Sequence, residues 1–362
     1  MSTPHVQSET QELLQPLEPA GERAPLPLFE DWSPQMSTAE CTGGDWTAPR
    51  RVASGKLPVH PGAMGIQFGQ SVFEGCKAFW NGKDPALLFR IDEHYKRLVA
   101  SCDRLRMPAP PEEIFLEAVL GQVKDSASWS SPFSSETLYI RPLVFGEDDH
   151  LMPVPSVRST FVVLTAPLRL FPDKPLVLFA EREFSRAARG GLGHAKTSAN
   201  YAHQYYPTWR AKEAGCDAVL WLDAETHDRI EEASTMNIFM VIGDELVTPS
   251  LQDTILDGIT RRSVITLARE RHGLTVVERP ITLNEVAEAA DVGTLEEVFV
   301  TSTALQIRPV SRVVDGERTI DFPEETPWAD QLHQDLIAIQ RGDADDKWGW
   351  ISKVPVRGEA RI

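Results

Sequence analysis

The spacing of apolar residues predicts two helices in the first half of the chain. In residues 91–105, Leu98 and Cys102 recur at helical spacing, and Pro108 ends the pattern. A second helical pattern follows Pro111. Runs of β-branched and apolar residues predict strands in the same half, at residues 64–80 (strand, turn and strand), 137–145 and 159–166.

The second half alternates short apolar runs with helical patterns. The strands are expected at residues 176–179, 218–222, 237–242, 245–248, 275–278 and 297–301. The helices are expected at residues 201–214, 260–271, 283–290 and 328–341. The tight turn at Gly243-Asp244 implies antiparallel pairing of two strands. We therefore expect an α+β protein with mixed, largely antiparallel sheets and flanking helices.

Composition divides the chain into four parts. A polar stretch punctuated by prolines predicts a flexible arm over residues 1–28, and a small α+β domain follows over residues 29–166. Three prolines predict a linker at residues 167–175, and residues 176–362 form a large domain. With 362 residues, of which 42% are hydrophobic, the chain is long enough for two cores and too short for three ordinary ones.

Net charge and cysteine content limit the kinds of ligand that the chain is expected to bind. The net charge of −17 and the isoelectric point near 5.0 argue against nucleic acid or an anionic membrane, so a small molecule is expected. No zinc, other metal or redox motif follows from the four scattered cysteines, Cys41, Cys76, Cys102 and Cys216. There is no signal-like segment and no run of about 18 apolar residues. These features predict a cytoplasmic protein with reduced thiols.

The candidate for chemistry is Lys196, which lies between a glycine-rich turn and the expected start of a helix, in the stretch Gly190–Ala202. A lysine that acts as a nucleophile needs a partly desolvated pocket that lowers its pKa. The glycines allow the backbone to approach a bound ring or phosphate closely. The alternative is a solvated lysine in an ordinary turn. A phosphate loop of the nucleotide-hydrolase type is poorly supported, because the glycine before the lysine is missing.

Two further segments contain residues that suggest anion binding. Arg141 interrupts the buried strand Leu138–Pro142, which is unfavourable unless the guanidinium meets an anion. A glycine followed by a hydroxyl residue opens a helix within Ile255–Arg261, and free backbone N–H groups at a helix start bind phosphate well.

In this order, the segments resemble the fold-type IV pyridoxal-phosphate enzymes, and most closely the branched-chain amino acid aminotransferases of the longer, eukaryote-like group. The resemblance runs from about Phe29 to the C-terminus. It is carried by Phe73–Phe79, Leu138–Pro142, Lys196–Tyr201, Thr235–Phe239 and Leu256–Arg261. It implies a two-domain enzyme that transfers the amino group of leucine, isoleucine or valine to 2-oxoglutarate. It also implies pyridoxal 5'-phosphate as the cofactor.

The resemblance assigns roles to residues around the cofactor ring. Lys196 would hold the cofactor covalently and then move the proton between the substrate α-carbon and the cofactor. Glu232 would face the pyridine nitrogen and keep it protonated. Glu231 is the alternative if the strand register differs by one residue. Tyr201 would hydrogen-bond the phenolic oxygen, and Leu256 would press on one ring face.

The resemblance also implies a phosphate site and a substrate site. The phosphate would be held by Arg97, Gly258, Ile259, Thr260 and Thr303. The substrate would meet Phe68, Phe73, Tyr139, Arg141, Thr235 and Ala304. A homodimer is implied, in which residues 146–157 of one subunit complete the site of the other. This loop would expose Leu151 and Met152 if no partner covered it.

The chain departs from the family pattern at several positions. Phe68 stands where a tyrosine is usual, Ser198-Ala199 where two glycines are frequent, and Ser302 where the turn usually begins with glycine. Leu305 and Arg308 replace the cysteine pair of animal mitochondrial members, which excludes a thiol switch there. The changes at 68 and 302 leave the donor range open. Alternatives are a D-amino-acid or amine transaminase, an aminodeoxychorismate lyase, or a relative that binds without catalysis.

Overall fold

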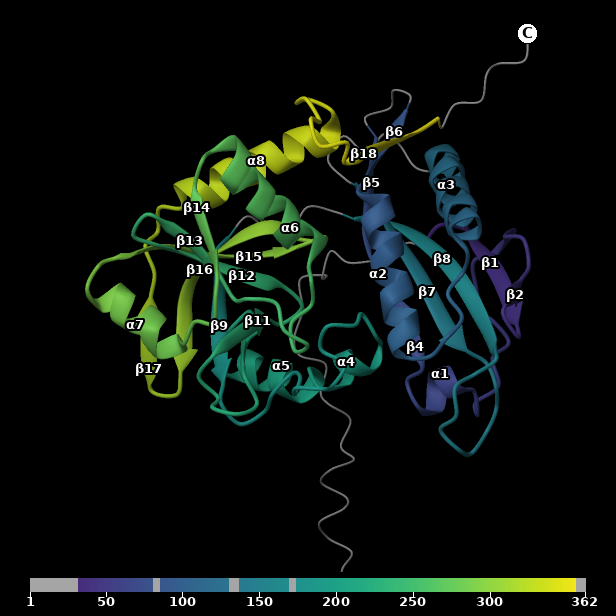
Figure 1. Cartoon of the computed structure of the whole chain (residues 1–362), viewed down its shortest axis with the longest axis horizontal. Helices are drawn as coiled ribbons and strands as arrows, with labels where there is room; N and C mark the ends of the chain where they lie inside the picture. Colours follow the sequence, from purple (N-terminus) through teal and green to yellow (C-terminus); the bar gives the residue numbers. More distant parts are fainter. Residues whose placement is uncertain (1–31, 81–84, 130–136, 169–173, 356–362) are drawn as a thin grey trace, which may run out of the picture.

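A computed structural model describes residues 32–80, 85–129, 137–168 and 174–355 of the chain. These residues form two lobes, each built around a nine-stranded sheet. Figure 1 shows the lobes side by side, with helix α8 (Pro327–Arg341) running along the second lobe toward the first. None of the helices in this described part combines the length and apolar composition that a membrane span requires.

The first sheet is antiparallel at every ladder between its described strands. Its main order is β18-β6-β5-β7-β8-β1-β2, with β3 paired to β1 and β4 paired to β7. The strands are β1 (Gln35–Thr42), β2 (Asp45–Trp46), β3 (Arg50–Ala53), β4 (Ser71–Phe73), β5 (Cys76–Phe79), β6 (Ala86–Phe89), β7 (Thr137–Gly146), β8 (Arg158–Leu168) and β18 (Ile351–Val354). The helices of this lobe are α1 (Met64–Gln67), α2 (Ile91–Arg104) and α3 (Glu112–Trp129).

The second sheet is mixed. Its order is β11-β10-β9-β16-β15-β12-β13-β14, with β17 paired to β16, and strand β9 is parallel to both of its neighbours. The strands are β9 (Leu176–Glu181), β10 (Ala218–Leu222), β11 (Ile230–Ala233), β12 (Asn237–Ile242), β13 (Glu245–Thr248), β14 (Thr275–Glu278), β15 (Leu295–Ser302), β16 (Gln306–Asp315) and β17 (Arg318–Asp321). The helices are α4 (Ala199–Ala202), α5 (Tyr205–Glu213), α6 (Ile259–Thr266), α7 (Leu283–Asp291) and α8. The expected α+β class with mixed, largely antiparallel sheets is confirmed.

Each lobe has its own apolar core, and a third cluster joins the two. In that cluster, Phe89 of β6 and Trp350 lie in one group with Phe239 of β12, Phe299 of β15 and the apolar face of α8. Burial of large aromatic side chains is a main source of packing energy. The cluster therefore holds the lobes together on the side opposite α4 and α5.

Several helices and strands differ from those predicted from the sequence, at positions where the local sequence patterns conflict. The helix expected at 201–214 is broken into α4 and α5, and the one expected at 260–271 ends in a π-helical turn after Thr266. Strand β11 was not expected, because its two adjacent glutamates obscure the apolar pattern. A short helix, α1, precedes the two strands of residues 64–80.

The expected division of the chain is corrected at one point. Residues 176–362 were assigned to a single large domain, but β18 pairs with β6 and so belongs to the first sheet. The expected arm at 1–28 and residues 169–173 of the expected linker lie outside the described residues.

Candidate active site

A cavity of about 590 Å³ lies where the two lobes meet, and residues from both sheets line it. The first lobe supplies strand ends at Phe73 and Tyr139 together with Arg97 of α2. The second lobe supplies the segment around Lys196, the start of α6 and the turn after β15. The expected site residues in this lining are Phe73, Arg97, Tyr139, Arg141, Lys196, Tyr201, Thr235, Leu256, Gly258, Ile259, Thr260, Thr303 and Ala304.

Lys196 is fixed in the cavity wall by its backbone and reaches inward with its side chain. Its carbonyl accepts a hydrogen bond from the Phe73 amide at 3.1 Å, and its own amide donates to Ser101 Oγ at 2.9 Å. Lys196 Nζ donates to Tyr201 Oη at 3.1 Å and lies 4.9 Å from the centre of the Phe73 ring. The ammonium group is thus held between a hydroxyl and an aromatic face, at the inner surface of the cavity.

The glycine-rich stretch before Lys196 serves packing within the protein. A Cβ at Gly193 would lie 2.6 Å from the Thr254 backbone, so only glycine fits there. Asn200 Nδ2 donates to the carbonyl of Ala195 at 2.7 Å and ties the turn to α4. Gly193 does not line the main cavity. It lines a smaller cavity, which Glu232 also lines.

Glu232 of β11 faces this same small space, which Lys196 and Tyr201 also line. Glu232 Oε1 accepts from the Leu256 amide at 2.6 Å, and Oε2 is 3.2 Å from Arg186 Nε. Burial raises the pKa of the Glu232 carboxyl, and the Arg186 guanidinium opposes that shift. The two partners hold the carboxylate in place beside the cavity that Lys196 also lines.

Arg97 is held rigidly by a buried carboxylate. Its Nε and Nη2 donate to the two oxygens of Glu74 at 2.6 and 2.9 Å, while Nη1 donates to the Asp257 carbonyl at 2.9 Å. His94 Nδ1 lies 2.7 Å from Glu74 Oε2. Burial alone would raise the pKa of Glu74, but Arg97 and His94 lower it well below its usual range. This arrangement positions one guanidinium beside the start of α6.

The start of α6 offers backbone donors to the cavity. Gly258 precedes the helix, and no side chain of the described residues caps it. A Cβ at Gly258 would lie 2.0 Å from Asn237 Oδ1, so close packing requires glycine. Ile259 and Thr260 line the cavity together with Arg97, so the free amides of this first turn are available to an anion there.

The turn between β15 and β16 forms another wall. Ser302 Oγ accepts from the Leu305 amide at 3.1 Å, and Gln306 Nε2 donates to the Thr303 carbonyl at 2.7 Å. Lys77 Nζ donates to the Ala304 carbonyl at 2.8 Å, and burial lowers the pKa of Lys77 to about 7. The turn is thus anchored from the first lobe.

Arg141 lies at the far end of the cavity among aromatic rings. Its Nη2 donates to Tyr139 Oη at 3.1 Å, and its guanidinium carbon is 4.5 Å from the Phe73 ring centre. Arg141 Nε is buried without a hydrogen-bond partner among the described residues. A Cβ at Gly75 would lie 1.9 Å from Tyr139 Oη, so the position of the Tyr139 side chain requires glycine there. The guanidinium in the expected buried strand thus retains capacity for an anionic ligand.

The structure differs from one sequence-based expectation and separates two alternatives. Phe68 follows α1 with 44% of its surface exposed and does not line the cavity of its own chain. Glu232 lines the same small cavity as Lys196, whereas its alternative Glu231 lines a different cavity.

Several lining residues had not been singled out as site residues. They are Gly75, Ser198, Tyr205, Asn237, Thr301, Ser302 and Leu305. Asn237 lies in a segment that carries the family resemblance, so a signal for it existed. Arg186, the partner of Glu232, lies in no motif, and only the structure reveals it.

Known proteins match the chain over most of its length. Residues 71–313 match the family described as Amino-transferase class IV. Branched-chain-amino-acid aminotransferase 2 of Bacillus subtilis (strain 168) is 38% identical over 321 residues, 87% of this chain and 88% of the relative. The mitochondrial branched-chain amino acid aminotransferase 1 of Humulus lupulus is 35% identical over 315 residues, 86% of this chain and 78% of the relative.

Solved structures share the fold. The branched-chain amino acid aminotransferase of Escherichia coli superposes with a TM-score of 0.71 at 26% identity, covering 88% of this chain and 99% of that one. The branched-chain amino acid aminotransferase of Thermobaculum terrenum in its holo form superposes with a TM-score of 0.72 at 24% identity, covering 88% and 98%. With these likenesses and the cavity geometry, the chain belongs to the class IV aminotransferases.

Proposed function

We propose that this chain is a pyridoxal-phosphate-dependent aminotransferase that moves the amino group of leucine, isoleucine or valine to 2-oxoglutarate. Curated branched-chain aminotransferases match it at 35–38% identity over about 86–90% of its length. The observation that carries the proposal is the placement of Lys196 Nζ beside Tyr201 Oη, with Glu232 on the adjoining wall.

The described residues fit a phosphorylated pyridine ring. The uncapped start of α6 and the guanidinium of Arg97 form one anion site, and Lys196 lies across the same cavity. Thr301 Oγ1 is a buried atom in the lining that has no hydrogen-bond partner among the described residues. Leu256 provides an apolar wall, and its amide fixes Glu232. One cavity thus contains partners for the phosphate group of the cofactor, for its pyridine ring and for its covalent link to lysine.

The chain's own residues then account for the transfer. When bound, pyridoxal phosphate supplies the electron sink that makes the substrate Cα–H bond acidic. Lys196 Nζ would take the proton from the substrate α-carbon and pass it on to the cofactor, and its hydrogen bond to Tyr201 Oη would orient the amine. Glu232, held by Arg186 and the Leu256 amide, stabilises positive charge at the ring nitrogen. Arg141 and the Ser302–Ala304 turn face the substrate carboxylate.

The end of the cavity toward the first lobe is suited to an aliphatic side chain. Phe73, Tyr139 and Leu305 contribute apolar surface there, and Arg141 provides the charged group. An aliphatic pocket discriminates only by about 1–3 kcal/mol per methylene, so the three branched substrates share it.

The proposal is tested by assay and by chemical labelling. The purified protein with cofactor should convert leucine, isoleucine and valine with 2-oxoglutarate and should show a visible, pH-sensitive absorbance band. Borohydride reduction followed by peptide mapping should place the label on Lys196. Label on Lys77 or Lys212, or a preference for D-amino acids or for amines without a carboxylate, would contradict the proposal.

We further propose a homodimer, on the basis of one exposed apolar surface. Leu151, Met152 and Val154 are 90%, 68% and 45% exposed, and Ile66 and Phe68 of the α1 segment are 59% and 44% exposed. A bridge between Ala63 and Asp149 and a hydrogen bond from Gln67 Nε2 to the His150 carbonyl place the two segments together. A second copy of the chain would cover such a surface.

Light scattering should give twice 40.3 kDa for the wild type. The double change Leu151→Asp and Met152→Asp should shift the protein toward the monomer, because it puts charge in the covered surface. Val292→Asp, at a 73% exposed position beyond α7, is the matched control and should stay dimeric. A fully active monomer of 40.3 kDa would contradict the dimer.

A cytoplasmic location is part of the same proposal. It is supported by the four cysteines, which are all free and buried.

A further inference from the structure

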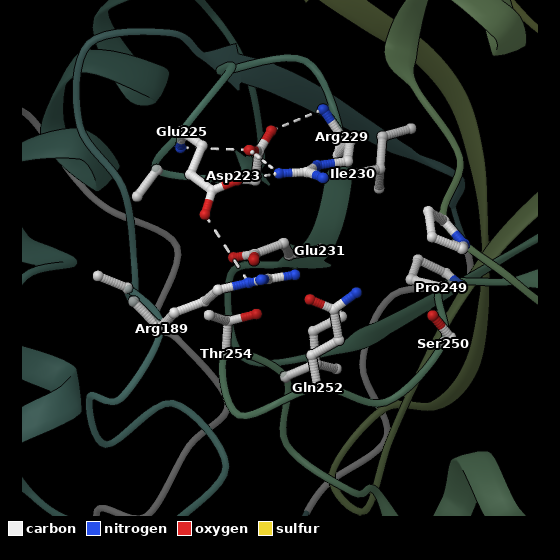
Figure 2. A pocket seen from close by; sticks show the side chains of 15 residues that line it. Arg189, Asp223, Glu225, Arg229, Ile230, Glu231, Pro249, Ser250, Gln252 and Thr254 are labelled. Atoms are coloured by element: carbon white, nitrogen blue, oxygen red, sulfur yellow. Dashed lines mark hydrogen bonds and ion pairs between the residues drawn. The ribbon is translucent and has the colours of Figure 1, made fainter.

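A second cavity, of about 310 Å³, lies beside β11 and shares no lining residue with the cavities at Lys196. Ile230 and Glu231 of that strand line it, together with residues 187–189, 223–225, 249–250, 252 and 254–255. Figure 2 shows Glu231, Thr254 and Gln252 directed toward its interior, while Asp223, Glu225 and Arg229 form one side. None of the roles proposed above uses this cavity.

Glu231 is the unusual group in this cavity. Only 6% of its surface is exposed, and its Oε2 has no hydrogen-bond partner among the described residues. Thr254, 4% exposed, also has an unpartnered Oγ1 in the same wall. Buried polar atoms without partners are rare in folded proteins. A carboxylate oxygen, which accepts only, and a hydroxyl, which both donates and accepts, therefore face a space that an external donor can fill.

The other charges of the cavity are already paired. Arg229 Nη2 lies 2.9 Å from Asp223 Oδ2 and 2.7 Å from Glu225 Oε2. Asp223 also accepts hydrogen bonds from the amides of Thr226 and Arg229 at 2.9 Å. Arg189, whose side chain is 63% exposed, lies 3.8 Å from Glu225 at the rim. The acidic groups of the lining, Asp223, Glu225 and Glu231, outnumber its two arginines, so the unpaired charge of the cavity is negative.

The shape and the remaining lining restrict the ligand further. Ala187, Ala188, Ile255 and Pro249 provide apolar surface around the acceptors. No group of three or more His, Cys, Asp or Glu side chains in the described part of the chain is arranged to hold a metal ion. A small organic cation with N–H donors and a short apolar body satisfies both the acceptors and the apolar wall.

We propose that this cavity binds a small primary ammonium compound, with the ammonium group donating to Glu231 Oε2 and Thr254 Oγ1. The site is separate from the candidate active site, because its lining shares no residue with either cavity beside Lys196. Binding forms no covalent bond and requires no cofactor.

The electrostatic surroundings predict how binding depends on pH. Burial raises the pKa of Glu231 to about 7, Arg186 opposes the shift, and Glu232 and Asp223 add to it. Glu225, Arg229 and Arg189 complete the charged groups around the cavity. Because an ammonium ligand needs the ionised carboxylate, affinity should rise about tenfold between pH 6 and pH 8.

The test measures binding of n-propylammonium chloride to the borohydride-reduced holoenzyme. In this form the cofactor is covalently attached to Lys196 by a reduced bond and cannot react with an amine. Equilibrium dialysis of the labelled amine should show saturable binding at pH 8, weakened at least tenfold by Glu231→Gln and several-fold by Thr254→Val. Glu225→Gln, at the paired rim, is the matched control and should change affinity by less than about threefold. Arg189→Gln should strengthen binding, because it removes a competing cation.

A control ligand and the Glu231→Gln variant distinguish binding of the ammonium group from non-specific binding. 1-Propanol, which has the same apolar body without the charge, should not compete for the site. Saturable binding that is lost in Glu231→Gln supports the inference. Absence of saturable binding in the wild type, equal affinity in the wild type and Glu231→Gln, or equal competition by 1-propanol would overturn it. Because the readout is ligand binding, it is independent of which amino acids the enzyme converts.

Discussion

Two neighbouring glutamates on β11 lie in contrasting environments, although they have the same side chain and are both buried. Glu232 has an amide donor at 2.6 Å and a guanidinium at 3.2 Å and adjoins Lys196. Glu231 has an oxygen without a partner among the described residues and faces the second cavity. A β-bulge opposite Trp221 and Leu222 leaves Glu231 without a pairing partner on β10, whereas Glu232 pairs with Trp221. The difference therefore comes from the partners that each side chain meets, and it assigns the two carboxylates to separate cavities.

The largest effect is expected from Lys196→Ala, which changes the cavity beside Glu232 and leaves the cavity lined by Glu231 unchanged. The variant should still bind the cofactor through Arg97 and the start of α6, but without the covalent link. Turnover should fall by several orders of magnitude, since both nucleophile and proton carrier are lost. Steady-state kinetics and the absorbance spectrum check this. Retention of more than a tenth of wild-type turnover would remove Lys196 from the proposed role.

Exchanging each glutamate for glutamine tests the comparison directly. Glu232→Gln should slow turnover on the order of 100-fold, because an amide does not stabilise a protonated ring nitrogen as a carboxylate does. Glu231→Gln should have a much smaller effect on the same step. Single-turnover rates measure both. The reverse order would mean that Glu231, and not Glu232, faces the ring.

Arg97→Ala should weaken cofactor binding by about 1.5–3 kcal/mol, the range for a hydrogen bond to a charged group. The change also leaves Glu74 buried without its cation, so the double variant Arg97→Ala with Glu74→Gln separates affinity from folding. Dialysis followed by cofactor quantification measures the affinity. Arg90→Ala is the control, because Arg90 donates to Ser263 Oγ and packs on Trp350 outside the cavity. Equal cofactor retention by wild type and Arg97→Ala would exclude Arg97 from the phosphate site.

The last effect concerns the stability contributed by Glu231. Its pKa is about 7 in the folded chain against an ordinary value of 4.5, so the folded chain binds more protons than the unfolded chain between these values. The free energy of unfolding should therefore fall as pH rises from 4.5 to 7, by about 2–3 kcal/mol from this group. Glu231→Gln should remove that part of the pH dependence in denaturant titrations. Identical pH profiles would show that Glu231 titrates normally.

Local patterns predicted the elements whose signals agree over many residues. Helix α2 and strands β7, β10 and β12 lie close to their expected bounds, because apolar periodicity and β-branched composition reinforce each other there. Strand β11 was missed, since its buried Glu232 is stabilised by Arg186 and the Leu256 amide, which lie far away in sequence. Strand β18 was missed because it exists only by pairing with β6, more than 250 residues earlier.

The sequence by itself determined the fold class and the family and predicted Lys196 as the reactive lysine, because these depend on short segments whose residue types and order carry the information. Only the tertiary structure decided which glutamate faces Lys196, that Phe68 lies outside the cavity of its own chain, and that Glu231 opens into a second cavity. The physical reason is that burial and hydrogen-bond partners set the chemistry of a carboxylate or a ring. Those partners come from segments that only the folded chain brings together.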